Sequence, residues 1–84
     1  MSVEKLPLAM VAAEERVTVV AVVGDAAVQK RLVDLGVVVG KELTVTQRQA
    51  DGPMVVAIDD ARLALGLEVT QKVFVTPVRE AEKV

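Results

Sequence analysis

Apolar residues are arranged along this chain in short runs that predict β-strands. Residues 17–23 are almost continuously apolar and rich in valine, which is typical of a strand that is buried on both faces or curls into a barrel. After Gly40, leucine and valine alternate with threonine over residues 43–46, which predicts a strand to about residue 49 with one buried face. Further strands are predicted at residues 54–58, 61–65 and 73–78. Five short strands therefore make up most of the predicted structure.

One segment has helical periodicity instead. Val28, Leu32 and Leu35 are spaced so that they share one face of a helix, and the residues between them are mostly polar. Asp25 has the side chain of an N-cap, because its carboxylate can accept a hydrogen bond from a free backbone N–H of the first turn. The predicted helix covers residues 26–35.

The end of this helix forms a compact unit with the residues that follow it. Gly36 is suited to the left-handed backbone conformation that ends a helix in a Schellman motif. In that motif Val37 packs back on Leu32, so the apolar loop is attached to the helix. Gly40 then precedes the second strand.

Turn-forming residues separate the remaining strands. Gly52 and Pro53 follow Ala50-Asp51 and favour a turn, since Pro does not fit a central strand. The pair Asp59-Asp60 forms a predicted hairpin tip. Five antiparallel strands with a helix inserted after the first predict a mostly β fold, a small curled barrel in which closure removes exposed edges. An open α+β sheet is the alternative architecture.

Length and composition indicate one small domain. The 84 residues fit a single domain over residues 1–84, with flexible ends predicted at 1–7 and 79–84. Hydrophobic residues make up 52% of the chain, yet Phe74 is the only aromatic residue, and we expect it in the core. The lack of cysteine suits a reducing cytoplasm, and no apolar run approaches the ~20 residues that span a membrane. We therefore expect a cytoplasmic protein that does not insert into the membrane.

The available residue types exclude most kinds of chemistry. Without His or Cys, only carboxylates could ligate a transition metal, and the acidic pairs at 14–15 and 59–60 are better explained as solvated turns. The single serine, Ser2, has no histidine to act as its base, so we predict no enzymatic activity, no cofactor and no metal site. A net charge of −2 and one aromatic residue argue against nucleic-acid binding, which uses basic grooves and aromatic stacking.

Four sequence features together resemble one known family. They are RLVDLGV at residues 31–37, Gly40, Gly52-Pro53, and RLAL at residues 62–65. With them the chain, from about residue 8 to residue 75, resembles the small SH3-like protein A of bacterial ferrous iron transport systems, the FeoA family. The same domain occurs as the C-terminal domain of some metal-dependent repressors. The resemblance implies an SH3-like barrel, and transition metal ions as the setting in which the family works.

Three positions depart from the family pattern. Val39 stands where a proline usually precedes the second glycine, Glu14 where a glycine usually opens the first strand, and Thr70 where the short helix usually carries alanine. We expect these departures to affect loop details more than the fold.

The resemblance also implies a function through a partner. In the family, the protein is a cytosolic accessory of the membrane ferrous iron permease, whose cytosolic portion carries a GTPase domain. The expected mode of action is docking on that portion, which regulates the permease or scaffolds its assembly. The alternative is a stand-alone relative of the repressor domain that acts in transcriptional regulation through association. A weak homo-oligomer is compatible with the valine content.

The docking surface is expected around the loop after the helix. Three consecutive valines cannot all turn inward on so short a loop, and Val37 is mostly assigned to the core. Val38 and Val39 suit the core and an exposed apolar patch equally well. The predicted partner-binding residues are Lys30, Arg31, Val38, Val39 and Lys41, although Lys30 and Arg31 could simply be the solvated face of the helix.

Overall fold

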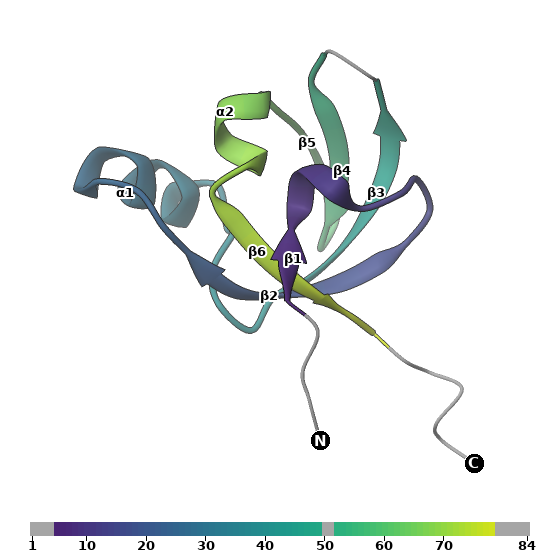
Figure 1. The fold of residues 1–84 in the computed structure, drawn as a ribbon, viewed down its shortest axis with the longest axis horizontal. Coiled ribbons are helices and arrows are strands. Elements are labelled where there is room, and N and C mark those ends of the chain that lie inside the picture. The colour runs from purple at the N-terminus through teal and green to yellow at the C-terminus, as the bar shows by residue number, and fades with distance from the viewer. Residues whose placement is uncertain (1–4, 50–51, 79–84) are drawn as a thin grey trace.

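The computed structural model describes residues 5–49 and 52–78, and over these residues the protein is a curved antiparallel sheet with short helices at its margins (Figure 1). The strands are β1 (Leu6–Pro7), β2 (Arg16–Val22), β3 (Glu42–Arg48), β4 (Met54–Ile58), β5 (Ala61–Leu65) and β6 (Val73–Pro77). The helices are the 3-10 helix η1 (Leu8–Met10) and the α-helices α1 (Ala26–Asp34) and α2 (Leu67–Thr70). The strand order is β1-β6-β2-β3-β4-β5.

The predicted mostly β, SH3-like fold is confirmed, and all five predicted strands are present close to their expected positions. The β4–β5 hairpin turns at Asp59-Asp60, where Asp59 has a left-handed φ of 53°. The expected closure is not found among the described residues: the strand order ends at β1 and β5, so the sheet keeps two edges.

Alternating burial places the core on one face of the sheet. In β4, for example, Met54, Val56 and Ile58 are buried, whereas the residues between them are partly exposed. The core consists of Leu8, Val11, Val17, Val19, Leu32, Val37, Leu43, Val45, Met54, Val56, Ile58, Leu65, Val73 and Val75. Valine dominates this list, as the β-rich sequence pattern requires.

Two irregular positions give the sheet its curvature. The register of β2 against β6 shifts between Val19 and Ala21, and that of β3 against β4 shifts between Val45 and Gln47. Such bulges increase the local twist of a strand. Just past the β2–β3 ladder, the Gly40 N–H donates to the Val19 carbonyl at 2.8 Å, which holds the end of the loop that follows α1 against β2.

The N-terminal boundary differs from the predicted flexible end at residues 1–7. Leu6 and Pro7 form β1 and pair with Val75 and Phe74 of β6. A two-residue strand has no periodicity that a sequence pattern could detect, and Pro is tolerated there because β1 is an edge strand. Lys5 precedes β1 within the described residues, and the other predicted flexible residues, 1–4 and 79–84, lie outside the described part of the chain.

Phe74, which is expected in the core, and Leu35, which shares the apolar face of the predicted helix, are both less buried than the sequence pattern predicts. Phe74 is half-buried on the opposite face of β6, with the Lys5 Nζ 5.8 Å from its ring centroid. Its neighbours Val73 and Val75 face the core, and strand alternation allows only one of the two faces to do so. Leu35 is 36% exposed, because α1 ends at Asp34 and the Schellman motif turns Val37 into the core instead.

Thr70 of α2, where the family usually carries alanine, is buried without disturbing the fold. Its Oγ1 donates a hydrogen bond to the Leu67 carbonyl at 3.2 Å. The hydroxyl is therefore satisfied inside its own helix, which removes most of the cost of burying it.

Candidate partner-binding surface

Local hydrogen bonds fix both ends of α1 and thereby position the loop that follows it. The Asp25 Oδ1 accepts from the Val28 N–H at 3.0 Å, which satisfies a free donor of the first turn. At the other end, Gly36 has φ 89° and its N–H donates to the Val33 carbonyl at 2.9 Å. The Val37 N–H donates to the Leu32 carbonyl at 2.8 Å. These two bonds define a Schellman motif.

The three valines of the loop divide between core and surface. Val37 is 1% exposed, whereas Val38 is 38% exposed and Val39 65% exposed. Val38 and Val39 line a small pocket of about 170 Å³, together with Val22, Gln29, Leu32, Val33 and Val37. The walls come from the end of β2, from α1 and from the loop, and they are apolar apart from the Gln29 amide.

Sequence reasoning missed part of this surface. Val33 is 58% exposed and stands beside Val38 and Val39 in the lining of the pocket. The signal was present in the sequence, because Val33 is an apolar residue outside the stripe formed by Val28 and Leu32. We refer to Val33, Val38 and Val39 as the valine patch.

The three predicted basic residues do not gather at the pocket: two of them are in ion pairs, and the third lies on the other side of α1. Lys30 pairs with Asp34 at 3.6 Å within α1, and Lys41 pairs with Asp59 of the β4–β5 hairpin at 2.9 Å. Arg31 is exposed, and it points about 200° around the helix from Gln29, since each residue of a helix turns by about 100°. The structure therefore brings Val38 and Val39 together at the pocket, while Arg31 lies on the other side of α1.

The remaining predicted turn residues come shortly before β3 and directly before β4. Gly40 has φ 94°, a conformation that costs other residues stability, and it precedes the ion-paired Lys41. Gly52 and Pro53 lie directly before β4. The first half of their predicted turn, residues 50–51, falls outside the described residues.

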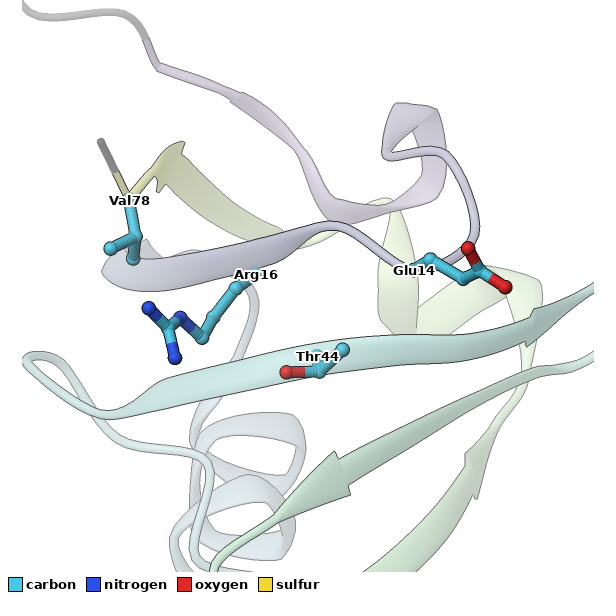
Figure 2. Close-up of a pocket in the computed structure, with 4 residues that line it drawn as sticks. All are labelled: Glu14, Arg16, Thr44 and Val78. Carbon is cyan, nitrogen blue, oxygen red and sulfur yellow. The ribbon is translucent and has the colours of Figure 1, made fainter. Parts of the chain in front are cut away.

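A second depression lies across β2 and β3. It is lined by Glu14, Arg16, Thr44 and Val78 and has a volume of about 410 Å³ (Figure 2). Figure 2 shows the Glu14 carboxylate and the Arg16 guanidinium pointing in opposite directions. Arg16 instead approaches the Glu42 Oε1 with its Nε at 3.9 Å. The two charged groups therefore do not face a common point in the depression.

The carboxylates of the described residues do not form a cluster that could bind a metal ion. Within residues 5–49 and 52–78, no three His, Cys, Asp or Glu side chains come close enough to hold a metal ion. One of the two aspartates at the hairpin tip, Asp59, is engaged by Lys41. In the same part of the chain, no helix is long and apolar enough to cross a membrane.

Comparison with known proteins agrees with this architecture. The family model described as FeoA domain matches residues 6–77. No curated protein sequence matches the chain significantly. A crystal structure of the iron uptake regulatory protein FeoA is 23% identical, with a TM-score of 0.85, and the match covers 89% of this chain and 100% of that one. The solution structure of a FeoA protein from Chlorobium tepidum is 28% identical, with a TM-score of 0.80, covering 93% and 75%.

A regulator also has this fold. A manganese-dependent transcriptional repressor is 22% identical with a TM-score of 0.85, and the match covers 93% of this chain but only 44% of the repressor. At that identity the likeness concerns the fold alone. The family-model match, by contrast, spans nearly all of the described residues and bears out the resemblance seen in the sequence. The chain belongs to the FeoA family of small SH3-like accessory domains, which is associated with ferrous iron transport.

Proposed function

We propose that this protein acts in ferrous iron uptake by docking, through the valine patch, on the cytosolic GTPase-containing part of the ferrous iron permease, and that docking regulates the permease or supports its assembly. The observation that carries the proposal is the exposure of Val33, Val38 and Val39 around one apolar pocket. Family membership supports the iron-transport setting. A cytosolic partner domain requires that the protein acts in the cytoplasm.

The pocket has a suitable size for one anchoring side chain. An apolar cavity of about 150 Å³ holds a benzene-sized group, and the pocket beside the valine patch measures about 170 Å³. Interfaces usually depend on a few such apolar anchors surrounded by residues that mainly exclude water. A Leu, Met or Phe side chain of the partner would fit, with Val39 as the most exposed contact.

The charged residues have secondary roles in this proposal. Lys30 and Lys41 are already paired with carboxylates, and exposed pairs of this kind contribute little to stability. Both pairs can open when a partner carboxylate approaches. Arg31 contributes only if the partner also reaches the opposite side of α1. An Arg31→Ala variant therefore distinguishes a compact interface from one that surrounds the helix.

The test is an NMR titration of the isotope-labelled protein with the purified GTPase domain of the permease, first with GDP and then with a GTP analogue. Docking through the valine patch shifts the amide signals of residues 30–41 and of Val22. Val39→Asp should weaken binding by about 30-fold or more, as expected for an interface hot spot. Met10→Asp is a matched control, because Met10 is 66% exposed and Val39 is 65% exposed, but Met10 lies on η1.

Thermal unfolding of both variants separates binding from folding. We expect Val39→Asp to unfold within a few degrees of the unmodified protein, because its side chain is mostly in solvent. Equal binding by both variants would contradict the proposal, as would a loss of binding that merely follows a loss of stability. No shifts with either nucleotide would exclude this partner.

The repressor-like fold supports one alternative. Association with a metal-dependent regulator is the competing function, since a manganese-dependent repressor contains a domain of the same fold. Titration with such a repressor separates the two. Shifts with the repressor, together with none for the permease domain, would move the assignment to transcriptional regulation.

A further inference from the structure

Helix α1 is the least anchored element of the described fold. Of its nine residues only Leu32 is buried, and Val28 is partly buried against the core. Figure 1 shows α1 projecting from the end of β2 at one side of the molecule. A helix of this length is not stable in water without tertiary packing. Its attachment therefore rests mainly on the apolar contacts of Leu32, Val28 and Val37.

The polar contacts around α1 do not reach the sheet. Asp25 accepts from Val28, Gln29 donates to the Gly24 carbonyl at 3.0 Å, and Lys30 pairs with Asp34. Among the described residues, every hydrogen bond or ion pair of residues 24–39 has its partner inside that segment, except the bond from the Lys41 N–H to the Val38 carbonyl. Separation of the segment from the sheet would therefore break no hydrogen bond to the sheet.

Each end of residues 24–39 is marked by a glycine and by a backbone hydrogen bond to the sheet. The Val23 N–H donates to the Lys72 carbonyl at 2.9 Å, and the Gly40 N–H donates to the Val19 carbonyl at 2.8 Å. Gly24 has φ 122° and Gly40 has φ 94°. Glycine absorbs changes in φ and ψ that other residues resist, so hinge motion concentrates there.

We propose that residues 24–39 form a separately opening unit, which leaves the sheet and loses its helix while β2, β3 and β6 stay folded. Proteins open in such cooperative units where buried apolar contacts are few. Opening of this unit would also affect docking. The walls of the pocket come from β2, α1 and the loop, so opening dismantles the binding site and closing rebuilds it.

Native-state hydrogen exchange at increasing urea tests the proposal without any partner. The reporters are the amides of Gln29, Leu35 and Val37, which donate inside the unit. The reference is the amide of Val45, which donates to the Glu15 carbonyl at 3.0 Å. Opening of the unit exposes less surface than global unfolding, so the reporters should exchange faster than Val45 and depend less steeply on urea.

Two matched Leu→Ala variants make the test sharper. Leu32 in α1 is 1% exposed and Leu65 in the edge strand β5 is 3% exposed. The contacts of Leu32 are lost when the unit opens alone and also when the whole protein unfolds. Leu32→Ala should therefore accelerate the exchange of the reporters and of Val45 by about 30-fold or more. Leu65→Ala should accelerate the exchange of Val45 to a similar extent and change the exchange rates of the reporters by less than about threefold, because Leu65 belongs to β5, which pairs with β4 outside the unit.

The opposite pattern would overturn the proposal. If the unit does not open separately, the reporters and Val45 share one urea dependence in the unmodified protein, and Leu65→Ala accelerates both sets equally. Since the experiment uses the free protein, its failure would leave docking untouched. A failure to bind the permease domain would likewise leave the opening unit standing.

Discussion

At the scale of single residues, Glu14 has a backbone conformation that its side chain disfavours. Its φ is 73°, and its N–H donates to the Val45 carbonyl at 2.6 Å, which fixes this geometry beside β3. The left-handed region costs an L-residue roughly 1–2 kcal/mol, whereas glycine adopts it freely but loses more entropy on folding. We expect Glu14→Gly to raise the free energy of unfolding by about 0.5–1 kcal/mol in urea denaturation.

The neighbouring residue gives the control for this prediction. Glu15 is also exposed, but its φ is negative, so Glu15→Gly gains nothing in the folded state. The free energy of unfolding of that variant should fall by about 0.5–1 kcal/mol, because glycine raises the conformational entropy of the unfolded chain. A Glu14→Gly variant that is destabilised as much as Glu15→Gly would show that strain at Glu14 is negligible.

Residue positions were predictable from the sequence where one local rule decides them. The roles of Asp25 and Gly36 follow from the rules of helix capping. The positive φ of Glu14 agrees with the glycine that the family usually carries at this position. Phe74 was not predictable, because it lies in a strand whose two faces are both largely apolar. Only the packing of Val73 and Val75 against the core decides which face turns inward.

At the scale of elements, the cap of α1 can be tested independently of its packing. The Asp25 carboxylate accepts from the Val28 N–H, and removal of an N-cap costs about 1 kcal/mol. We expect Asp25→Ala to lower the free energy of unfolding by about that amount. Asp34→Ala is the control: Asp34 lies at the negative end of the helix dipole, which offsets its exposed pair with Lys30.

Urea denaturation of the two aspartate variants gives the comparison. Asp34→Ala should change the free energy of unfolding by less than about 0.5 kcal/mol. Equal losses in both variants would contradict a special role of the cap. The cap would also be contradicted if the loss in Asp25→Ala came from its charge at the helix N-terminus rather than from its hydrogen bond to Val28. Asp25→Asn would then fail to restore stability, whereas a true cap is restored by asparagine.

Elements were predictable in proportion to their length. The five strands of five or more residues are marked by apolar runs or by alternation, and α1 by helical periodicity, so their positions could be read from the sequence. The two-residue β1 and the three-residue η1 have none. The valine patch was only half predictable for a related reason: Val38 and Val39 stood out in their loop, but the contribution of Val33 depends on how α1 lies against that loop.

At the scale of the whole molecule, one core is assembled from distant parts of the chain. Leu8 of η1 is fully buried in the same cluster as Val56 and Val75, and the Arg48 Nη2 donates to the Ala9 carbonyl at 2.9 Å, which ties η1 to the end of β3. The N-terminal segment therefore closes the core, although it contributes only a two-residue strand to the sheet.

A matched pair of substitutions in η1 tests this dependence. Leu8→Ala should cost about 2–5 kcal/mol, because it leaves a cavity in the core. At ~0.05–0.15 kcal/mol per residue, a chain of 84 residues has roughly 4–13 kcal/mol of stability in total. Met10→Ala, two positions away and 66% exposed, should change stability by less than about 0.5 kcal/mol. If both variants unfold at the same urea concentration as the unmodified protein, η1 does not close the core, and the sheet must hold together without it.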